Sequence, residues 1–401
     1  MRALLFSFAL ALAGVAAAQQ KPPTVRPEVG KPLQAAVEAL KARRAKDALA
    51  RVREAQAVPD KTPYENYLVT RVHGQAAAAA GDNATAAKAL EDASNSSAAP
   101  ENERLQLLAG AASAYYASKE YGKAASLATR YFQHGGTDKA IRTVYVQSLY
   151  LSGNYSGASR ELAADVEAEE RAGKNPPEEQ LQLLANAYLQ SKDPAGYSRT
   201  MERLVALYPK RDYWLSVLHN VVTRPGFNDR LAIDVSRLKL DAGMMRSADE
   251  YLDYAQMALI EGFPLEASHV IDKGYAAGVL GTGPEAARHK RLKDLAAKNL
   301  AEDKKTMAQG GSGTKDDKAL FNEGFNYVLH GNAQKGLDMM QQAMKTGAGF
   351  RRPDHAKLQL AYAFHVAGQN EKAVQTFKGV QGTDGAAALA RLWVIRLSKT
   401  S

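Results

Sequence analysis

A short turn that recurs along the chain limits the possible folds more than any other feature of this sequence. Each turn holds glycine or small polar residues. A small residue follows a few positions later, and a large apolar residue comes one helical turn after that. In "YLSGNYSGASREL", for example, Gly153 is followed by Ala158 and Leu162. The turns return at intervals of about 33 to 39 residues, which is typical of an array of one repeated supersecondary unit.

Apolar residues at helical spacing lie on both sides of these turns. Before one turn, Leu181, Leu184 and Tyr188 recur three or four residues apart, and Ala373 and Phe377 do the same after another. Both patterns have the period of an α-helix, so each unit is predicted to be a helix, a short turn and a second helix. Since one hairpin cannot bury its apolar side alone, successive hairpins must stack on one another. The sequence therefore predicts an all-α fold of stacked helical hairpins.

The repeated unit resembles the tetratricopeptide repeat, whose period is about 34 residues. The first helices carry a small residue at matching places, namely Gly74, Ala112, Ala185, Ala255, Gly324 and Ala361. The second helices carry an alanine at Ala86, Ala124, Ala158, Ala267 and Ala373. The resemblance covers roughly residues 29–382, with a break after Gly281. It implies a solenoid that winds as a right-handed superhelix, with a concave face lined by the first helix of each pair.

The first residues have the pattern of a secretory signal peptide. Arg2 gives a positive start, the apolar run "ALLFSFALALAGV" follows, and alanines occupy Ala16–Ala18. The run is shorter than the roughly 20 apolar residues of a membrane span, and no later run reaches that length. The chain has no cysteine, which excludes a lipoprotein anchor. We expect residues 1–18 to be removed and the protein to be periplasmic, without a transmembrane helix.

Composition divides the remainder of the chain into four segments. Residues 19–30, "QQKPPTVRPEVG", are rich in proline and are expected to form a flexible lead-in. Residues 31–307 are expected to form the main solenoid, ending in a long charged helix. Residues 308–316, which contain "GGSGT", are predicted to be a linker. Residues 317–401 are then a final pair of repeats with a capping helix.

The last predicted helix, "GAAALARLWVIRLSK", is apolar on more than one side. Terminal repeats usually present a polar outer face. One interpretation is that this helix is a cap packed deeply onto the preceding repeat. The alternative is that Trp393 or Ile395 joins an interface with a partner or with a second copy of the chain.

Motifs for catalysis or cofactor binding are absent from the sequence. The eight histidines are scattered, no His-Glu-x-x-His pattern occurs, and there is no cysteine for a zinc site. Glycine-rich phosphate loops and the nucleophile elbow of hydrolases are missing as well. We therefore expect no metal, no cofactor and no enzymatic activity.

The positive charge of the chain does not mark a nucleic-acid-binding surface. The formal net charge is +9 over 401 residues, and the densest basic cluster is "RHKRLK" at 288–293. This cluster is interleaved with Glu285, Asp294 and Glu302 along a predicted helix, so it is interpreted as a solvated helix face. Export also argues against nucleic acid as a partner.

A binding groove is the site that the resemblance implies. In the tetratricopeptide family, side chains of the first helices line the groove, and the register assigns to it Tyr116, Gln147, Tyr150, Gln182, Asn186, Gln256, Phe321, Phe325, Leu358 and Tyr362. The polar members suit an extended peptide, and the apolar C-terminal members suit an amphipathic helix. The family's clamp for a C-terminal carboxylate uses Lys, Arg and Asn. Because these positions hold no Lys or Arg, that mode of binding is not expected.

These observations favour a non-catalytic periplasmic adaptor that binds protein or peptide segments and supports a cell-envelope complex. Such an adaptor would reach the membrane only through its partner. The alternative is a self-associating structural scaffold, which would form homo-oligomers. A third class, less favoured by the sequence, is a protein that binds an anionic envelope polymer, or an enzyme.

Overall fold

The computed structural model describes residues 24–309, 313–314, 316–346 and 349–398. The expected signal peptide at 1–18, the start of the lead-in and the central glycines of the expected linker lie outside these residues. Within them, every regular element is helical and no strand occurs. The all-α prediction is therefore confirmed. No helix in the described part of the chain combines the length and apolarity that crossing a membrane requires.

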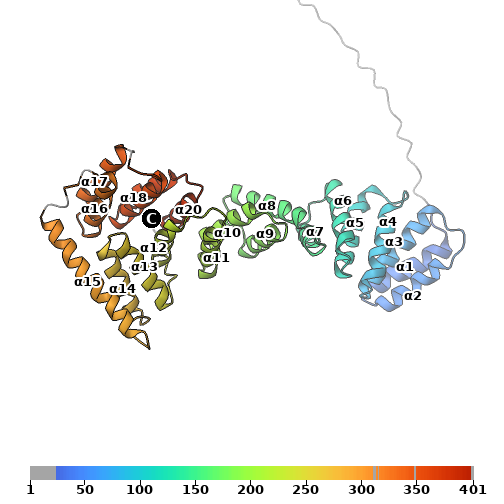
Figure 1. Ribbon diagram of the computed structural model, residues 1–401. Coiled ribbons are helices and arrows are strands. Elements are labelled where there is room, and N and C mark those ends of the chain that lie inside the picture. The colour runs from blue at the N-terminus through green and yellow to red at the C-terminus, as the bar shows by residue number, and fades with distance from the viewer. Residues whose placement is uncertain (1–23, 310–312, 315, 347–348, 399–401) are drawn as a thin grey trace, which may run out of the picture. The chain divides into compact units, whose positions relative to one another are not determined.

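The helices form two compact units that meet within α8 (Tyr155–Arg171), the first ending at Leu162. The first unit contains α1 (Pro27–Lys41), α2 (Ala45–Gln56), α3 (Pro63–Ala79), α4 (Asn83–Asn95), α5 (Glu101–Ala117), α6 (Tyr121–Gln133), α7 (Lys139–Leu151) and the start of α8. From α1 to α7, each helix packs against its neighbours in sequence, and the pairs α1/α2, α3/α4 and α5/α6 are the predicted hairpins (Figure 1).

Residues in a left-handed conformation end helices in the turns of the first unit. α7 ends at Leu151, and Gly153 follows with φ +82°, a left-handed conformation that ends the helix. Alanine dominates the core between the helices, which allows their backbones to approach closely. Fully buried examples are Ala76, Ala77, Ala86, Ala111, Ala112, Ala124 and Ala128.

The start of α1 differs from the expected lead-in. Helix α1 begins at Pro27, and Val29 is 0% exposed. Just before it, the guanidinium of Arg26 donates to the carboxylate of Glu65, which also accepts from the backbone N–H of Thr62 in the capping box of α3. The side-chain hydrogen bond from Arg26, followed by backbone hydrogen bonds from Arg26 and Thr62, lowers the pKa of Glu65 to about 2. This anchor to α3 explains why residues 27–30 are ordered as helix.

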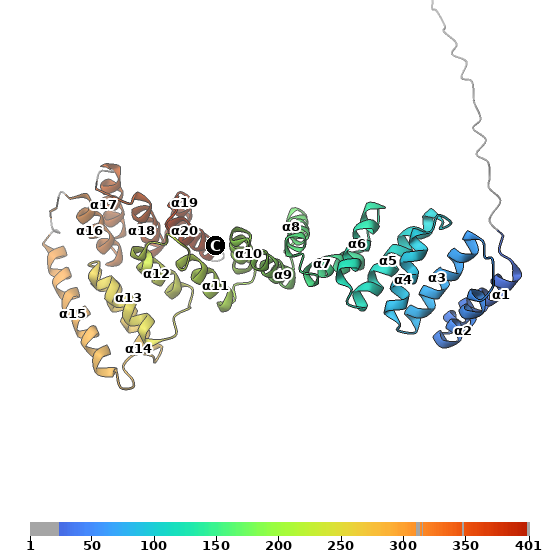
Figure 2. The same cartoon turned by 45° about the vertical axis from the view of Figure 1, so that its right-hand side comes forward.

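The second unit contains the rest of α8, and then α9 (Glu178–Gln190), α10 (Pro194–Leu207), α11 (Arg211–Val222), the short 3-10 helix η1 (Asp229–Leu231), α12 (Ala232–Asp241), α13 (Ala248–Ile260), α14 (Pro264–Ala276), α15 (Ala286–Ala308), α16 (Asp317–Leu329), α17 (Ala333–Thr346), α18 (Pro353–Val366), α19 (Asn370–Lys378) and α20 (Ala386–Leu397). Helix α11 ends at Val222, three residues before Pro225, whose ring cannot continue a helix. The charged stretch after Gly283 forms α15, which packs beside α13 and α14 (Figure 2).

Helix α20 packs back onto helices that lie far earlier in the sequence of the second unit. It contacts α10 and α12 as well as its neighbours α18 and α19. The guanidinium of Arg391 is 3.1 Å from a carboxylate oxygen of Glu202, and that of Arg396 is 2.8 Å from a carboxylate oxygen of Asp241. The second unit is therefore closed by its last helix, whereas a simple linear array has contacts between successive hairpins only.

Candidate functional site

Hydrogen bonds between consecutive first helices create a polar face in each unit. In the first unit, the hydroxyl of Tyr116 on α5 donates to Oε1 of Gln147 on α7 at 2.7 Å. In the second unit, Nε2 of Gln182 on α9 donates to the hydroxyl of Tyr213 on α11 at 2.5 Å. Both pairs are separated by 31 residues. In each unit a tyrosine and a glutamine on consecutive first helices are thus hydrogen-bonded, near the end of α5 in the first unit and near the start of α9 in the second.

Helix α3 is joined to α5 in the first unit through charged groups. The hydroxyl of Tyr67 and the guanidinium of Arg71, both on α3, donate to one carboxylate oxygen of Glu103 on α5. Burial acts to raise the pKa of Glu103, but the hydrogen bonds from Tyr67 and Arg71 outweigh it and lower that pKa. Consecutive first helices in this unit are thus tied together by polar side chains.

The remaining predicted groove residues fall into two groups. Gln182 and Asn186 are exposed, whereas Tyr116, Gln147, Tyr150, Gln256 and Tyr362 are partly buried. Phe321 and Leu358 are 2% and 1% exposed, and Phe325 packs against the ring of Phe263 with centroids 4.9 Å apart. The apolar members belong to the core of the C-terminal hairpins, so we keep only the solvent-accessible residues in the groove that we propose below.

The predicted interface residues on α20 lie at different depths. Trp393 is 1% exposed, and its ring stacks on Phe377 with centroids 5.6 Å apart. It also contacts the rings of Tyr362 and His365. Ile395 is partly buried. This placement matches the description of α20 as a packed cap.

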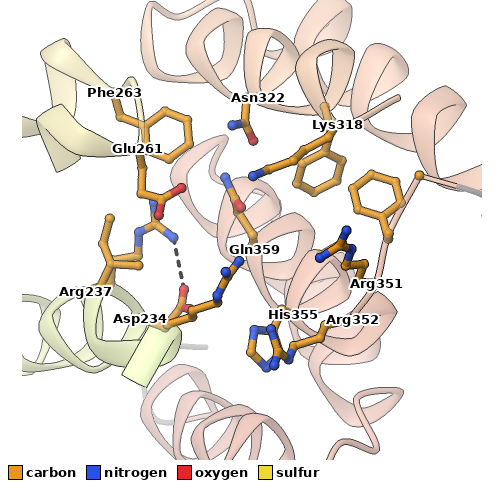
Figure 3. Close-up of a pocket in the computed structure, with 16 residues that line it drawn as sticks. Asp234, Arg237, Glu261, Phe263, Lys318, Asn322, Arg351, Arg352, His355 and Gln359 are labelled. Atoms are coloured by element: carbon orange, nitrogen blue, oxygen red, sulfur yellow. Dashed lines mark hydrogen bonds and ion pairs between the residues drawn. The ribbon is translucent and has the colours of Figure 1, made fainter. Parts of the chain in front are cut away.

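Helices α12, α16 and α18, together with η1, the turn between α13 and α14 and residues 349–352, surround a cavity of about 380 Å³ in the second unit. It lies among α12, α16 and α18, with residues 349–352 on one side (Figure 3). Its polar and aromatic lining includes Arg230, Asp234, Arg237, Glu261, Phe263, Lys318, Phe321, Asn322, Phe350, Arg351, Arg352, His355 and Gln359.

One wall of the cavity is a fully paired ionic network. Arg237 is 2% exposed and donates to both carboxylate oxygens of Glu266, at 2.8 and 2.9 Å, and to Asp234 at 3.0 Å. The hydroxyl of Tyr254 donates to Glu266 at 2.7 Å. Burial opposes the charge of Arg237, but Glu266 and Asp234 outweigh it, so the pKa of Arg237 is raised. Burial likewise raises the pKa of Asp234, although Arg237 acts to lower it.

The rim of the cavity carries cations that have no such partners. Arg230, Lys318, Arg351 and Arg352 all line the cavity and are exposed. Among the residues that the structure describes, none of these four forms an ion pair with a carboxylate. In the described part of the chain, the rim therefore carries four cations without ion-pair partners, and Glu261 is the one lining carboxylate outside the Arg237 network.

The cavity also contains a hydrogen-bond donor without an acceptor. The side-chain nitrogen Nε2 of Gln359 is buried and has no partner among the described residues. Figure 3 shows the amide of Gln359 and the ammonium group of Lys318 directed into the same central space. A buried amide N–H without a partner is unfavourable, so this nitrogen indicates a place for an acceptor atom.

Of these cavity residues, Phe321 alone was among the predicted site residues, and the charged and polar ones were not. Lys318 and Asn322 lie one helical turn apart on a first helix, and Arg351 and Arg352 directly precede the next first helix. This spacing could have predicted the site from the sequence, because it places these four residues toward one end of two neighbouring helices. No sequence pattern predicts that α12 contributes to the cavity, because its approach to α16 and α18 depends on tertiary packing.

Histidine–aspartate contacts also connect distant parts of the second unit. Nε2 of His365 on α18 is 3.2 Å from Oδ1 of Asp241 on α12, and Nδ1 of His365 is 2.8 Å from Asn370. Burial acts to lower the pKa of His365. The hydrogen bonds to Asp241 and Asn370 outweigh burial, so the pKa is raised above its ordinary value of 6.5. Arg396 also faces Asp241, and its charge acts to lower the pKa of His365.

We expect the second unit to lose stability as the pH rises through the raised pKa of His365. A raised pKa in the folded state means that the contribution is fully present below about pH 6.5 and is lost at higher pH. Urea denaturation between pH 6 and pH 8 should show this loss, and His365→Gln should reduce it. An equal slope in both proteins would contradict the assignment.

The positions of the small residues decide the type of hairpin. A Cβ added to Gly74 on α3 would lie 2.7 Å from the side chain of Leu90 on α4. A Cβ added to Gly324 on α16 would lie 2.7 Å from the carbonyl oxygen of Gly336 on α17. The small residues on the first helices thus allow the second helices to approach closely. The tetratricopeptide repeat, which the sequence resembles, has small residues at the same places. The chain has a tetratricopeptide-like fold.

Comparisons with known proteins add no function to this fold. No protein-family model and no curated protein matches the chain. Similar solved structures include Naa15/Naa10 bound to HypK-THB, at 13% identity and a TM-score of 0.28. The match covers 88% of this chain and 63% of that chain. The TPR domain of P58(IPK) has 12% identity and a TM-score of 0.25, with 93% and 98% of the two chains covered.

Yeast Tom70 is a further similar structure, at 12% identity and a TM-score of 0.25, with 93% of this chain and 96% of that chain covered. This chain thus spans less than two thirds of the Naa15/Naa10 chain that it matches. At TM-scores of 0.28 and below, the matches carry no argument about activity or partner. The described part of the tetratricopeptide-like array contains no group of three or more side chains that could hold a metal ion.

Proposed function

We propose that this protein is a non-catalytic adaptor that binds extended protein segments along the first-helix faces of its hairpins. The observation that carries the proposal is the polar face at which Tyr116 meets Gln147 and Gln182 meets Tyr213. Amide and phenol groups at a regular spacing can donate to and accept from the backbone of an extended segment. Fold alone would not support this assignment, because one fold can serve many functions.

The cellular setting of the proposal rests on the N-terminal sequence. A positive start, an apolar run and Ala16–Ala18 support export. We therefore propose that the adaptor acts in the periplasm, where it supports the assembly or function of a cell-envelope complex. It contacts the membrane through its partner.

The groove is tested by removing its exposed amides on α9. Gln182→Ala with Asn186→Ala removes two side chains that lie one helical turn apart and are exposed. We expect capture of protein partners by crosslinking in the periplasm to fall at least about fivefold. Stability should change by less than about 1 kcal/mol, because exposed substitutions rarely cost more.

A matched control removes two exposed side chains from second helices. Glu167→Ala with Arg199→Ala changes α8 and α10 and leaves the net charge unchanged. The control should capture the same partners as the unmodified protein. If both double variants behave alike, the first-helix face is not the binding surface.

A further inference from the structure

We propose that the cavity among α12, α16 and α18 binds a small organic phosphate. The inference does not depend on the adaptor role, because the cavity lies within the second unit and is built by residues outside the proposed groove. It rests on three independent features of the cavity: its charge, its unpaired donor, and its size and aromatic lining.

The charge of the lining calls for an anion. Five cationic side chains and two carboxylates line the cavity. Asp234 is already engaged by Arg237, which leaves Glu261 as the carboxylate that can offset the rim. The rim cations include three arginines, Arg230, Arg351 and Arg352. Guanidinium groups match phosphate oxygens in paired hydrogen bonds, and a dianion balances this excess of positive charge better than a single carboxylate does.

The unpaired donor gives the anion a position. Nε2 of Gln359 is buried and has no acceptor among the described side chains and backbone groups. Lys318 and Asn322, one turn apart on α16, bring further donors to the same cavity. A phosphate group has three terminal oxygens, so it can accept from Gln359 and from the rim cations at once.

The size of the cavity favours a small molecule over a bare ion. About 380 Å³ lies within the range of small-molecule sites and exceeds what inorganic phosphate fills. Phe321 and Phe350 line it with their rings edge to face, at a centroid distance of 5.3 Å. These rings provide an apolar wall for the organic part of the ligand, while the rim holds its phosphate.

Calorimetry on the full mature chain with phenyl phosphate as the probe tests the proposal. We expect binding at one site, at least tenfold tighter than that of inorganic phosphate, because only the organic ester contacts the aromatic wall. Benzoate, which has a similar ring and a single negative charge, should bind at least tenfold more weakly than phenyl phosphate. The binding of an acidic peptide with a free C-terminus is measured in the same way, to test whether the cavity binds a protein segment instead.

Paired variants connect the binding to the rim. Arg351→Gln with Arg352→Gln should weaken phenyl phosphate binding at least tenfold. The control, Arg199→Gln with Arg246→Gln, removes the same charge from exposed residues of the second unit that lie outside the cavity, and it should bind normally. Gln359→Leu should weaken binding several-fold at unchanged net charge. Tryptophan fluorescence checks that each variant is folded.

Three results would overturn the proposal. The first is no binding of phenyl phosphate at millimolar concentration to the folded protein. The second is an equal loss of binding in the rim variant and in its charge-matched control, which would indicate attraction by net charge alone. The third is binding of the acidic peptide in preference to phenyl phosphate, which would assign the cavity to a protein segment. None of these results bears on partner capture by the α9 variant.

Discussion

Replacing Arg237 with alanine is expected to lower the free energy of unfolding of the second unit by about 3–5 kcal/mol. Arg237 is 2% exposed and holds the carboxylates of Glu266 and Asp234. Its loss leaves both carboxylates buried without their cation, and it removes a guanidinium packed over the ring of Phe325. Breaking one side of a buried ion pair costs more than the pair itself contributes, because the remaining charge stays desolvated.

Urea denaturation followed by tryptophan fluorescence measures this loss directly. Both tryptophans of the chain, Trp214 and Trp393, lie in the second unit and are buried. The signal therefore reports this unit alone. Arg246→Ala, at an exposed position, is the control and should stay within about 0.5 kcal/mol of the unmodified protein.

A compensated variant separates charge from packing. Arg237→Met combined with Asp234→Asn and Glu266→Gln removes all three buried charges together. It should recover more than half of the stability that Arg237→Ala loses, because apolar and neutral groups of similar size can replace a buried ionic network. If the combined variant is as unstable as Arg237→Ala, the uncompensated charges of Asp234 and Glu266 do not cause the loss, and the explanation by buried unpaired charge is wrong.

Replacing Trp393 with alanine is the second large expected effect, at about 3–5 kcal/mol. The ring is 1% exposed and packs against Phe377, Tyr362 and His365, so its removal leaves a large cavity where α20 meets α18 and α19. Denaturation can still be followed through Trp214. The midpoint should move to clearly lower urea concentration with little change in the slope.

Ile395→Ala is the matched substitution on the same helix. Ile395 is partly buried, so the loss should be smaller, at about 1 kcal/mol. Light scattering should give the same mass for both variants and the unmodified protein. A change in mass would favour the alternative in which α20 forms an interface, and equal costs for the two substitutions would contradict the packing described for Trp393.

Local patterns explain how much of the fold could be predicted. The hairpins follow from apolar residues at helical spacing and from small residues such as Gly74 and Gly324, which act between helices that are adjacent in sequence. Contacts such as Arg391 with Glu202 join residues 189 positions apart and leave no periodic trace. For this reason the return of α20 to α10 and α12 was not predicted.

The candidate site was predictable only in part, for the same physical reason. Register assigned Tyr116, Gln147 and Gln182 to the first-helix face, and each is hydrogen-bonded to a neighbouring first helix, whereas Tyr213, the partner of Gln182, was not predicted. Register does not distinguish a first-helix side chain that faces solvent from one covered by the next hairpin. Phe321 illustrates this, because it was assigned to the groove from its position and is buried.

The return of α20 to α10 and α12 has a consequence for the order of folding during synthesis. Every hairpin of the first unit can be completed as soon as its own residues emerge, because its partners are neighbours in sequence. The second unit cannot complete its packing until α20 (Ala386–Leu397) has been synthesised. Until then the faces of α10 and α12 that α20 covers stay open to solvent, so the growing chain depends on this helix to complete the second unit.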